Sequence, residues 1–389
     1  MYSKKSFDKL IYGANLIRTI FRHKARKQFA FNVISNQEEL YSFSSGEDIL
    51  KIDLYMPRLD TAFKNLGPVP KERGPIAPIR VHWAKFIKAL YERHQKLGHD
   101  VRLLELPLWQ ITPDLVKKTS PNAHRIYIPH KMRENWWLDQ RVYYFMQMVI
   151  PNIFSIDNHG WCASASSYPI QPNGCENSGV YEMLSKRIKL NTSKFKQPEY
   201  KRTGLEPGYV FFPCQLPHDE TIKYHSDVEV GTALRQTMNW IRKFNLNRPK
   251  GTKPRSIVVK GHPANSNAMG PLQEVYHELA REMPGMAHWV DDMSIHQLIA
   301  DARVVVSVNS GVGLEAILHG KSIFVFGKAD YDTIQHNNSK NVSSDKETAL
   351  ELSYRELSSE NLKIYKKFID SWYNTHFNHE DLNSFKKII

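Results

Sequence analysis

Three short loops in the second half of the sequence carry side chains whose types and spacing suit chemistry on anions and sugars. In the first loop an apolar run ends in Lys260, Gly261, His262 and Pro263. A lysine and an imidazole delivered by a strand can neutralise a phosphate and the group that leaves with it. Alone this loop is a weak indication, because the chain has 17 histidines and one of them can fall on a surface loop by chance.

The second loop begins at Ser310 and continues through Gly311 and Gly313 to Glu315. Ser310 is a fitting helix N-cap, and the two glycines expose backbone N–H groups at a helix N-terminus, which favours an anion. Glu315 lies near the start of the same helix, where its carboxylate could accept hydrogen bonds from ribose hydroxyls. Ordinary capping, with glycines for close packing, is the alternative interpretation.

The third loop runs from Gln215 to Asp219 and places a carboxylate just beyond a strand. A carboxylate there can act as a base or as a nucleophile toward an anomeric carbon. An ordinary loop aspartate is the alternative. Asp227 is the competing carboxylate, and its place at the start of the following helix predicts a capping role.

Alternating strand and helix patterns predict the elements that position these loops. In the second half the β-branched runs lack polar alternation, as strands of a parallel sheet covered on both faces do. Ligands bind at the carboxyl ends of such strands, where all three loops lie. The predicted strands cover 208–215, 255–263, 286–290, 303–309 and 322–327, and the predicted helices cover 228–244, 271–283, 294–302 and 310–320.

The first half shows the same alternation less clearly. Apolar residues at helical spacing predict a helix over 81–97, which Gly98 ends. We therefore predict an α/β protein of GT-B-like architecture, with two Rossmann-type parallel-sheet domains that face a cleft. The domains would span 1–205 and 206–389, and the last helices could pack back on the first. Further predictions in the first half are strands over 99–106, 125–130 and 152–157, a tryptophan-rich helix over 135–148, and an irregular insertion and linker over 168–208.

The composition is that of a globular protein, with 41% hydrophobic residues and a net charge of +13 over 389 residues. No stretch is apolar and long enough to span a membrane, and the three cysteines lack a metal-ligand spacing, so we expect a cytoplasmic protein. No nucleic-acid-binding motif accompanies the basic residues, so nucleic acid is not an expected partner. Basic and apolar residues near the N-terminus suggest peripheral contact with the anionic inner membrane; a first helix of the N-terminal domain is the alternative.

In their order along the chain, the three loops resemble motifs of the capsule-synthesis family of bacterial Kdo transferases. An acidic loop at Asp291 and Asp292 resembles the place where the nucleotide base docks in that family, although adjacent carboxylates before a helix are also common as capping residues. The other matching residues are Gln215 and Asp219, then Lys260, His262 and Pro263, then Ser310, Gly313, Glu315 and Ala316, and finally Phe326, Gly327 and Tyr331.

The resemblance implies a glycosyltransferase that moves Kdo from CMP-β-Kdo to a saccharide or lipid-linked saccharide acceptor in capsule, O-antigen or lipopolysaccharide synthesis. It implies retention of anomeric configuration through a covalent sugar adduct on Asp219. His262 would contact the CMP phosphate. The nucleotide would be held without a metal or another cofactor by Lys260, Pro263, Asp292 and the helix that starts with Ser310, Gly311, Gly313 and Glu315.

The first half departs from the family pattern at the segment that carries Asp157. Where the family has an acidic residue followed by Asp-Gly-Phe, this chain has Ser155-Ile156-Asp157-Asn158-His159-Gly160-Trp161. Asp157 still ends a predicted strand beside the cleft, so we expect it to act as the acceptor base or to contact Kdo. Two alternatives stay open: a transferase of another CMP-activated acid, such as a sialic acid, and a non-catalytic basic scaffold on a membrane or nucleic acid.

Overall fold

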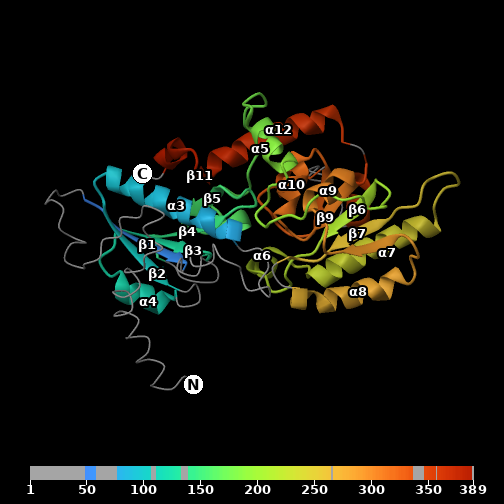
Figure 1. Ribbon diagram of the computed structural model, residues 1–389, viewed down its shortest axis with the longest axis horizontal. Helices are drawn as coiled ribbons and strands as arrows, with labels where there is room; N and C mark the ends of the chain where they lie inside the picture. Colours follow the sequence, from blue (N-terminus) through green and yellow to red (C-terminus); the bar gives the residue numbers. More distant parts are fainter. Residues whose placement is uncertain are drawn as a thin grey trace, which may run out of the picture.

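The computed structural model contains two β-sheets that lie side by side along the long axis of the molecule, each with helices packed against it (Figure 1). The predicted amphipathic segment at the N-terminus lies outside the described residues. Within the described part of the chain, no helix is both long and apolar enough to cross a membrane. The described residues are 49–57, 77–106, 111–132, 139–263, 266–335, 346–355 and 357–387.

The first sheet has six strands in the order β11-β5-β4-β3-β1-β2. The strands β1 to β4 are parallel, whereas β5 runs antiparallel to β4 and β11 antiparallel to β5. Phe86 of α3 stacks on Phe154 of β5, so this helix covers one face of the sheet. The elements are β1 (Lys51–Pro57), α3 (Ala77–Lys96), β2 (Asp100–Leu106), α4 (Pro113–Thr119), β3 (Arg125–Pro129), β4 (Val142–Gln147), β5 (Ile153–Asp157) and β11 (Phe377–Asn378).

Two predictions for the first half are wrong. The helix expected over 135–148 is a strand where the structure describes its end, because β4 occupies Val142–Gln147. The first four of its residues VYYFMQ are β-branched or aromatic, and all six but Tyr143 are buried, which suits a central strand. The segment 168–208 is not wholly irregular, since it contains the helix α5 (Val180–Lys189).

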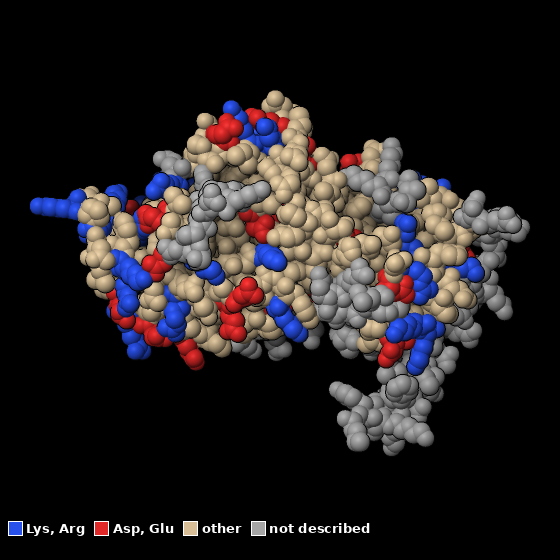
Figure 2. Space-filling view, turned by 180° about the vertical axis from the view of Figure 1, so that it is seen from behind, with Lys and Arg blue, Asp and Glu red and all other residues tan. Residues whose placement is uncertain are grey.

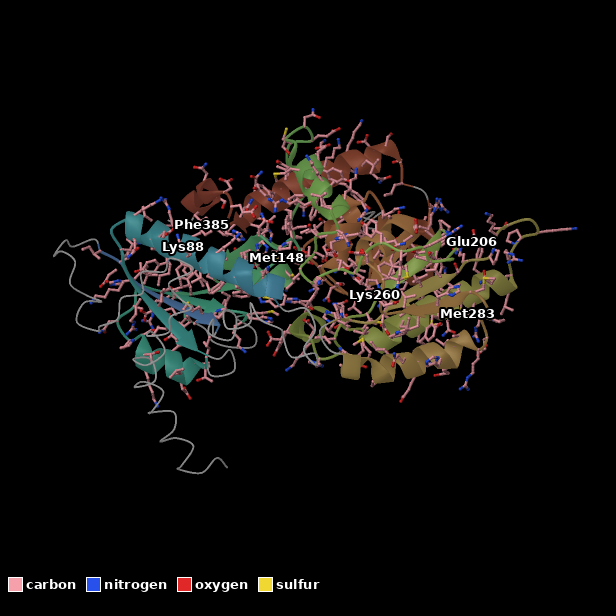
Figure 3. All side chains as sticks on the ribbon, viewed as in Figure 1. Lys88, Met148, Glu206, Lys260, Met283 and Phe385 are labelled. Atoms are coloured by element: carbon pink, nitrogen blue, oxygen red, sulfur yellow. The ribbon has the colours of Figure 1, made fainter. Side chains whose placement is uncertain are left out.

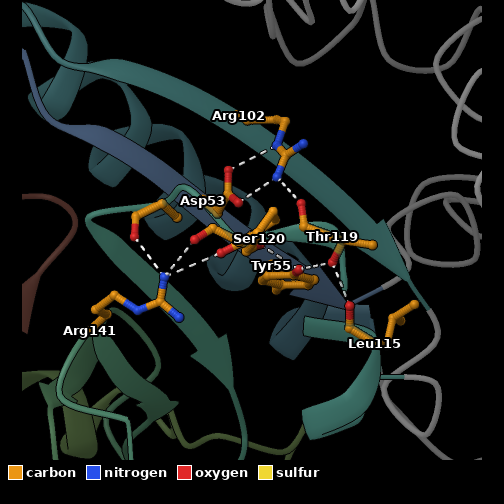
Figure 4. Close-up of polar contacts among 9 residues, drawn as sticks. Asp53, Tyr55, Arg102, Leu115, Thr119, Ser120 and Arg141 are labelled. Carbon is orange, nitrogen blue, oxygen red and sulfur yellow. Dashed lines mark hydrogen bonds and ion pairs between the residues drawn. The ribbon is translucent and has the colours of Figure 1, made fainter. Parts of the chain in front are cut away.

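A network of polar contacts fixes the C-terminal end of α4 (Figure 4). The Arg102 guanidinium pairs with Asp53 through two bonds of 2.9 and 2.5 Å and also donates to the Thr119 carbonyl. Arg141 donates to three carbonyls in the turn after α4, at 3.1 to 3.4 Å. These bonds satisfy carbonyls that a helix end leaves without partners.

The second sheet has five parallel strands in the order β10-β9-β6-β7-β8. Alternate β6 residues enter two cores, Val210 beneath α7 and α8 and Phe211 beneath α9 and α10. Both faces are therefore covered, as the uninterrupted apolar runs predict. The elements are β6 (Tyr209–Pro213), α6 (Glu220–His225), α7 (Val230–Leu246), β7 (Ile257–Lys260), α8 (Gly270–Ala280), β8 (Ala287–Val290), α9 (Ile295–Asp301), β9 (Ala302–Ser307), α10 (Val312–Leu318) and β10 (Ser322–Val325).

The predicted strands and helices of the second half are thus confirmed, with bounds that shift by a few residues. Ser294 caps α9 as predicted, since its side chain accepts a bond from His296 N. The expectation of an α/β protein with parallel sheets is also confirmed, apart from the two antiparallel strands of the first sheet.

The end of the chain returns to the first sheet. After α11 (Lys346–Ser353), the helix α12 (Ser359–Thr375) runs from the second sheet toward the first, where β11 adds to β5 (Figure 1). Short 3-10 turns follow Trp161 at η7 (Cys162–Ser164) and close the chain at η10 (Leu382–Lys387). The rings of Phe385 and Phe86 of α3 lie 5.8 Å apart between centroids, so η10 packs into the first core. The domain division at residues 205 and 206 stays a prediction.

On the face that Figure 2 shows, Lys and Arg are interspersed with Asp and Glu. Several exposed cations pair with acids, such as Arg235 with Glu278 at 2.6 Å and Lys366 with Glu182 at 2.7 Å. Exposed pairs of this kind contribute little to stability.

Candidate functional site

The loops that carry the predicted site lie where the order of the second sheet reverses. The chain passes from β6 to β7 and β8, then returns to β9 and β10 on the other side of β6. Ligands of open α/β sheets bind at such a switch point, beyond the carboxyl ends of the strands. This end of the sheet faces the first domain, because a side chain at Gly311 would contact Val149 just after β4 at 3.2 Å. Figure 3 shows Lys260 and Met148, which begins that turn, near the middle of the molecule.

Gln215 locks two of these loops together. Its side chain accepts a bond from Asn309 N at 3.0 Å and donates one to the Asn309 side-chain oxygen at 2.9 Å. Asn309 in turn donates to the Thr221 carbonyl at 2.8 Å. Because Gln215 and Asn309 are buried, these bonds hold the loops after β6 and β9 in one fixed arrangement. The glutamine of the Gln-x-x-x-Asp motif thus has a positioning role.

Asp219 is the N-cap of α6 and is half-buried. Its Oδ1 accepts bonds from Thr221 N at 2.9 Å and from the Thr221 hydroxyl at 2.8 Å. Among the described residues, its Oδ2 has no hydrogen-bond donor. The capping bonds orient the carboxylate and leave one oxygen available, which is the arrangement that a nucleophile or base requires. Asp227, by contrast, caps nothing, since the N-cap of α7 is Glu229; the capping role expected for Asp227 is wrong.

Lys260 ends β7 and is buried. Its ammonium donates to the Asp291 carbonyl at 2.6 Å, and burial lowers its pKa although Asp291 and Asp292 oppose the effect. Gly261 N donates to Asp291 Oδ1 at 3.2 Å, and a side chain at Gly261 would overlap that oxygen. Asp291 therefore shapes this loop. Asp292, the residue expected at the nucleotide base, is mostly exposed and pairs with Lys201.

His262 is half-buried and its ring meets the edge of Phe195 at 5.4 Å between centroids. Burial lowers its pKa to about 4, and Lys194 and Lys260 lower it further while Asp219 raises it. The imidazole is therefore uncharged near neutral pH, so it can donate a hydrogen bond to a phosphate but does not bring a permanent charge. Pro263 follows it on the surface.

The loop after β9 differs in detail from the expected N-cap. Gly311, not Ser310, is the N-cap of α10, and it makes no side-chain cap bond. The Ser310 hydroxyl accepts from Val312 N at 3.3 Å. Gly313 packs so closely on Tyr331 that a side chain there would overlap the ring, and the Tyr331 hydroxyl donates to the Ser310 carbonyl. The motif that contains Ser310 and Gly313 and the motif that ends in Tyr331 therefore pack against each other.

Glu315 is almost completely buried, with 1% of its surface exposed. Burial raises its pKa to about 8, and a hydrogen bond from Ser193 opposes that effect. Among the described residues, its Oε1 has no hydrogen-bond partner, and His296 Nε2 lies 3.9 Å away. The carboxyl group is therefore protonated at neutral pH, and ribose hydroxyls can reach it only if the residues that cover it move.

Asp157 lies at the end of β5, but the antiparallel direction of β5 changes its place. It pairs with Tyr144, three positions before the last residue of β4. Both of its oxygens are engaged, one by His159 N at 2.7 Å and the other by the Ser166 hydroxyl. A base in this position would have to exchange one of those bonds for a substrate.

Two residues that were not singled out from the sequence lie near Asp219 and His262. His130 follows β3 at the switch point of the first sheet, with a left-handed φ of 57° and a pKa lowered to about 4, mainly by burial. Lys194 follows α5, and burial lowers its pKa. Charges of Lys194 and Asp219 act on both histidines. The strand RIYIP before His130 was a usable signal, because a histidine follows its last residue, much as His262 follows β7 two residues after Lys260. No comparable signal marked Lys194.

The arrangement combines an oriented carboxylate, two uncharged imidazoles and two lysines near the carboxyl ends of strands from both sheets, with Lys194 reaching there from the segment after α5. It suits the binding of an anion and attack on a carbon next to it. Among the described residues, no group of three or more His, Cys, Asp or Glu side chains has an arrangement that could hold a metal ion.

Comparisons with known proteins agree on a family. A family model described as "Capsule polysaccharide biosynthesis protein" matches residues 140–363, which is more than half of the chain. Among curated relatives, Protein FixF of Sinorhizobium fredii is 26% identical over 148 residues, 36% of this chain and 32% of that protein. Capsule polysaccharide export protein KpsS of Escherichia coli is 27% identical over 134 residues, 33% of this chain and 32% of that protein. The matches therefore span about a third of the length of these relatives.

Solved structures show more distant similarity. The β-Kdo 2,7 transferase of Thermosulfurimonas dismutans KpsC is 16% identical with a TM-score of 0.41, over 78% of this chain and 89% of that chain. The β-Kdo 2,4 transferase of the same KpsC is 14% identical with a TM-score of 0.42, over 73% of this chain and 87% of that chain.

Proposed function

The chain belongs to the capsule polysaccharide biosynthesis protein family, and from this premise we propose that it is a glycosyltransferase that moves Kdo from CMP-β-Kdo to a saccharide acceptor. The observation that carries the proposal is the convergence of Asp219, Lys260 and His262 at the switch point of a parallel sheet. The oriented carboxylate lies beside groups that can bind a phosphate.

The proposed reaction proceeds with retention in two displacements. Asp219 Oδ2 attacks the anomeric carbon of Kdo, the bond from that carbon to the phosphate oxygen breaks, and CMP leaves with the electron pair. An acceptor hydroxyl then attacks the same carbon, the bond to Asp219 breaks, and the hydroxyl proton passes to a base, the role we assign to Asp157. Two inversions give net retention.

The nucleotide would lie against the second sheet. Lys260 and His262 would face its phosphate, the loop from Ser310 to Gly313 would lie beside that phosphate with the Gly311 N–H as its donor, since the other three N–H groups of the loop bond within the protein, and Glu315 would meet the ribose. Binding without a divalent cation is part of the proposal, since lysine and N–H donors supply the positive potential. Peripheral contact with an anionic membrane belongs to the same proposal and concerns residues outside the described part.

The test is a pair of measurements on the full chain. Calorimetry should detect CMP binding in the presence of EDTA. Incubation with CMP-Kdo and a panel of saccharide acceptors should give a product whose mass increases by one Kdo residue. CMP binding that appears only with a divalent cation would contradict the proposed metal-independent nucleotide site. Transfer from a CMP-sialic acid but not from CMP-Kdo would contradict CMP-Kdo as the donor.

A further inference from the structure

A segment between the two domains delivers Lys194. Residues 191–198, here called the bridging segment, follow α5 and lie against the second domain. The Asn191 side chain accepts from the Ser294 hydroxyl at 2.5 Å, and Gln197 accepts from Ile295 N at 2.9 Å. Both ends of the bridging segment are therefore fixed to the start of α9.

Between those ends, Lys194 reaches the first sheet. Its ammonium donates one long bond of 3.4 Å to the carbonyl of Gln147, the last residue of β4. The next residue, Phe195, packs on His262 of the second domain. Lys194 thus lies between the carboxyl ends of β4 and β7.

The ammonium of Lys194 has too few partners for its surroundings. It is half-buried, and within the described residues its single hydrogen bond leaves two N–H groups without an acceptor in the protein. Burial lowers the pKa of Lys194 and the charge of Asp219 raises it, yet the two side chains form no ion pair. A partly desolvated ammonium in this state is stabilised by an added anion.

The neighbouring groups indicate which anion fits. Lys260 and His262 lie on the second-domain side, where the nucleotide phosphate is expected, whereas Lys194 lies toward β4 and acts electrostatically on Asp219. In a keto-sugar acid such as Kdo, the carboxylate is bonded to the anomeric carbon itself. A group that binds this carboxylate must therefore lie beside the carboxylate that attacks that carbon, as Lys194 does.

We infer that Lys194 binds the carboxylate of the acidic sugar and so makes the site select acidic over neutral sugars. This inference rests on the proposed function. Lys194 has a further effect on the reaction, because Asp219 must approach a carbon that already carries a negative group. A cation between the two carboxylates reduces their repulsion.

The test compares Lys194→Met with Lys196→Met, which changes an exposed lysine of the same bridging segment. The probes are free Kdo, its uncharged methyl ester and CMP, with binding followed by saturation-transfer NMR and calorimetry. We expect Lys194→Met to weaken binding of Kdo by roughly tenfold or more and to leave CMP unchanged. Lys196→Met should bind all three as the wild type does, and Lys194→Arg should restore part of the affinity for Kdo.

The outcomes separate this inference from the proposed function. If Kdo binding needs Lys194 but the wild type does not bind CMP, the inference is supported and CMP-Kdo is contradicted as the donor. Equal weakening of CMP and Kdo by Lys194→Met would place the lysine at the phosphate and overturn the inference. So would unchanged Kdo binding by Lys194→Met, or no Kdo binding by the wild type. If Lys194→Met unfolds, Lys194→Gln against Lys194→Arg makes the same comparison of charge.

Discussion

The two sides of the candidate site are built differently. On the second-domain side, close polar contacts within the protein hold the loops, namely Gln215 with Asn309, Lys260 with the Asp291 carbonyl, and Tyr331 with the Ser310 carbonyl. Among the described residues, single oxygens of Asp219 and Glu315 lack a partner there. Toward the first domain, Lys194 has one long bond. A preorganised side suits a constant ligand such as a nucleotide, and the unsatisfied ammonium of Lys194 requires a ligand to complete its hydrogen bonds.

The largest effect should come from Asp219→Asn, which tests the group between the two sides. Asparagine also caps helices, so α6 and the fold should persist. Transfer should fall by roughly a thousandfold or more, because an amide is a far poorer nucleophile than a carboxylate. The measurement is the transfer rate together with intact-protein mass spectrometry of the Kdo adduct.

Asp227→Asn is the matched control and should transfer normally, since Asp227 does not cap α7. Peptide mapping should place the adduct at Asp219. An adduct on Asp227 or Asp157, or an undiminished rate in Asp219→Asn, would contradict the assignment.

The difference between the two sides also explains how far the sequence could be interpreted. The second sheet is covered on both faces, so its strands are continuous apolar runs, and the loops that follow them could be found directly. In the first half the same reasoning gave a wrong prediction at β4, because Tyr143, Tyr144 and Phe145 suit a strand or a helix equally well. Its antiparallel pairing with β5 then moved Asp157 from its expected place.

The bridging segment could not be predicted for a different reason. Its contacts depend on side chains distant in sequence, such as Gln197 with Ile295 and His296 with the Thr192 carbonyl. No local period marks residues whose partners lie about a hundred positions away. Lys194 therefore became visible only when the fold placed it beside Asp219.

A substitution at Gly313 tests the fixed arrangement of the loops on the second-domain side. Gly313→Ala should lower the free energy of unfolding by about 3 kcal/mol, because the added methyl overlaps Tyr331 and displaces the hydroxyl that binds the Ser310 carbonyl. Urea unfolding measures this. Gly270→Ala, at an open position of α8, is the control and should leave stability unchanged or slightly raised. Equal stability of the two variants would show that Tyr331 moves without cost.

A smaller effect should follow from His262→Ala. The uncharged imidazole can donate one hydrogen bond to the nucleotide phosphate. Its loss should therefore lower the affinity for CMP by roughly tenfold and leave the affinity for cytidine unchanged. Calorimetry with both ligands measures the difference. His277→Ala, an exposed histidine of α8, should bind both ligands normally. Equal weakening of CMP and cytidine would move His262 away from the phosphate.

A pH-dependent effect is expected at Glu315, where the two sides of the site meet, since this glutamate belongs to α10 and Ser193 of the bridging segment bonds to it. Its folded pKa of about 8 lies above the ordinary value of 4.5. A carboxyl group shifted in this direction contributes stability that is complete below pH 4.5 and is lost as the pH rises through 8. Glu315→Gln cannot ionise, so its stability should stay close to that of the wild type at pH 5 and exceed it by roughly 3 kcal/mol at pH 8, because each unit of pKa shift corresponds to about 1.4 kcal/mol.

Chemical unfolding at the two pH values measures that difference, and Glu274→Gln, at an exposed position of α8, should show none. CMP binding adds a second readout at pH 7. If ribose hydroxyls meet Glu315, then Glu315→Gln should weaken CMP and cytidine by the same factor, in contrast to His262→Ala. A stability difference that does not grow between pH 5 and pH 8 would mean that the bridging segment already opens and lets water reach the carboxyl group. In that case the second-domain side is less preorganised than its hydrogen bonds indicate.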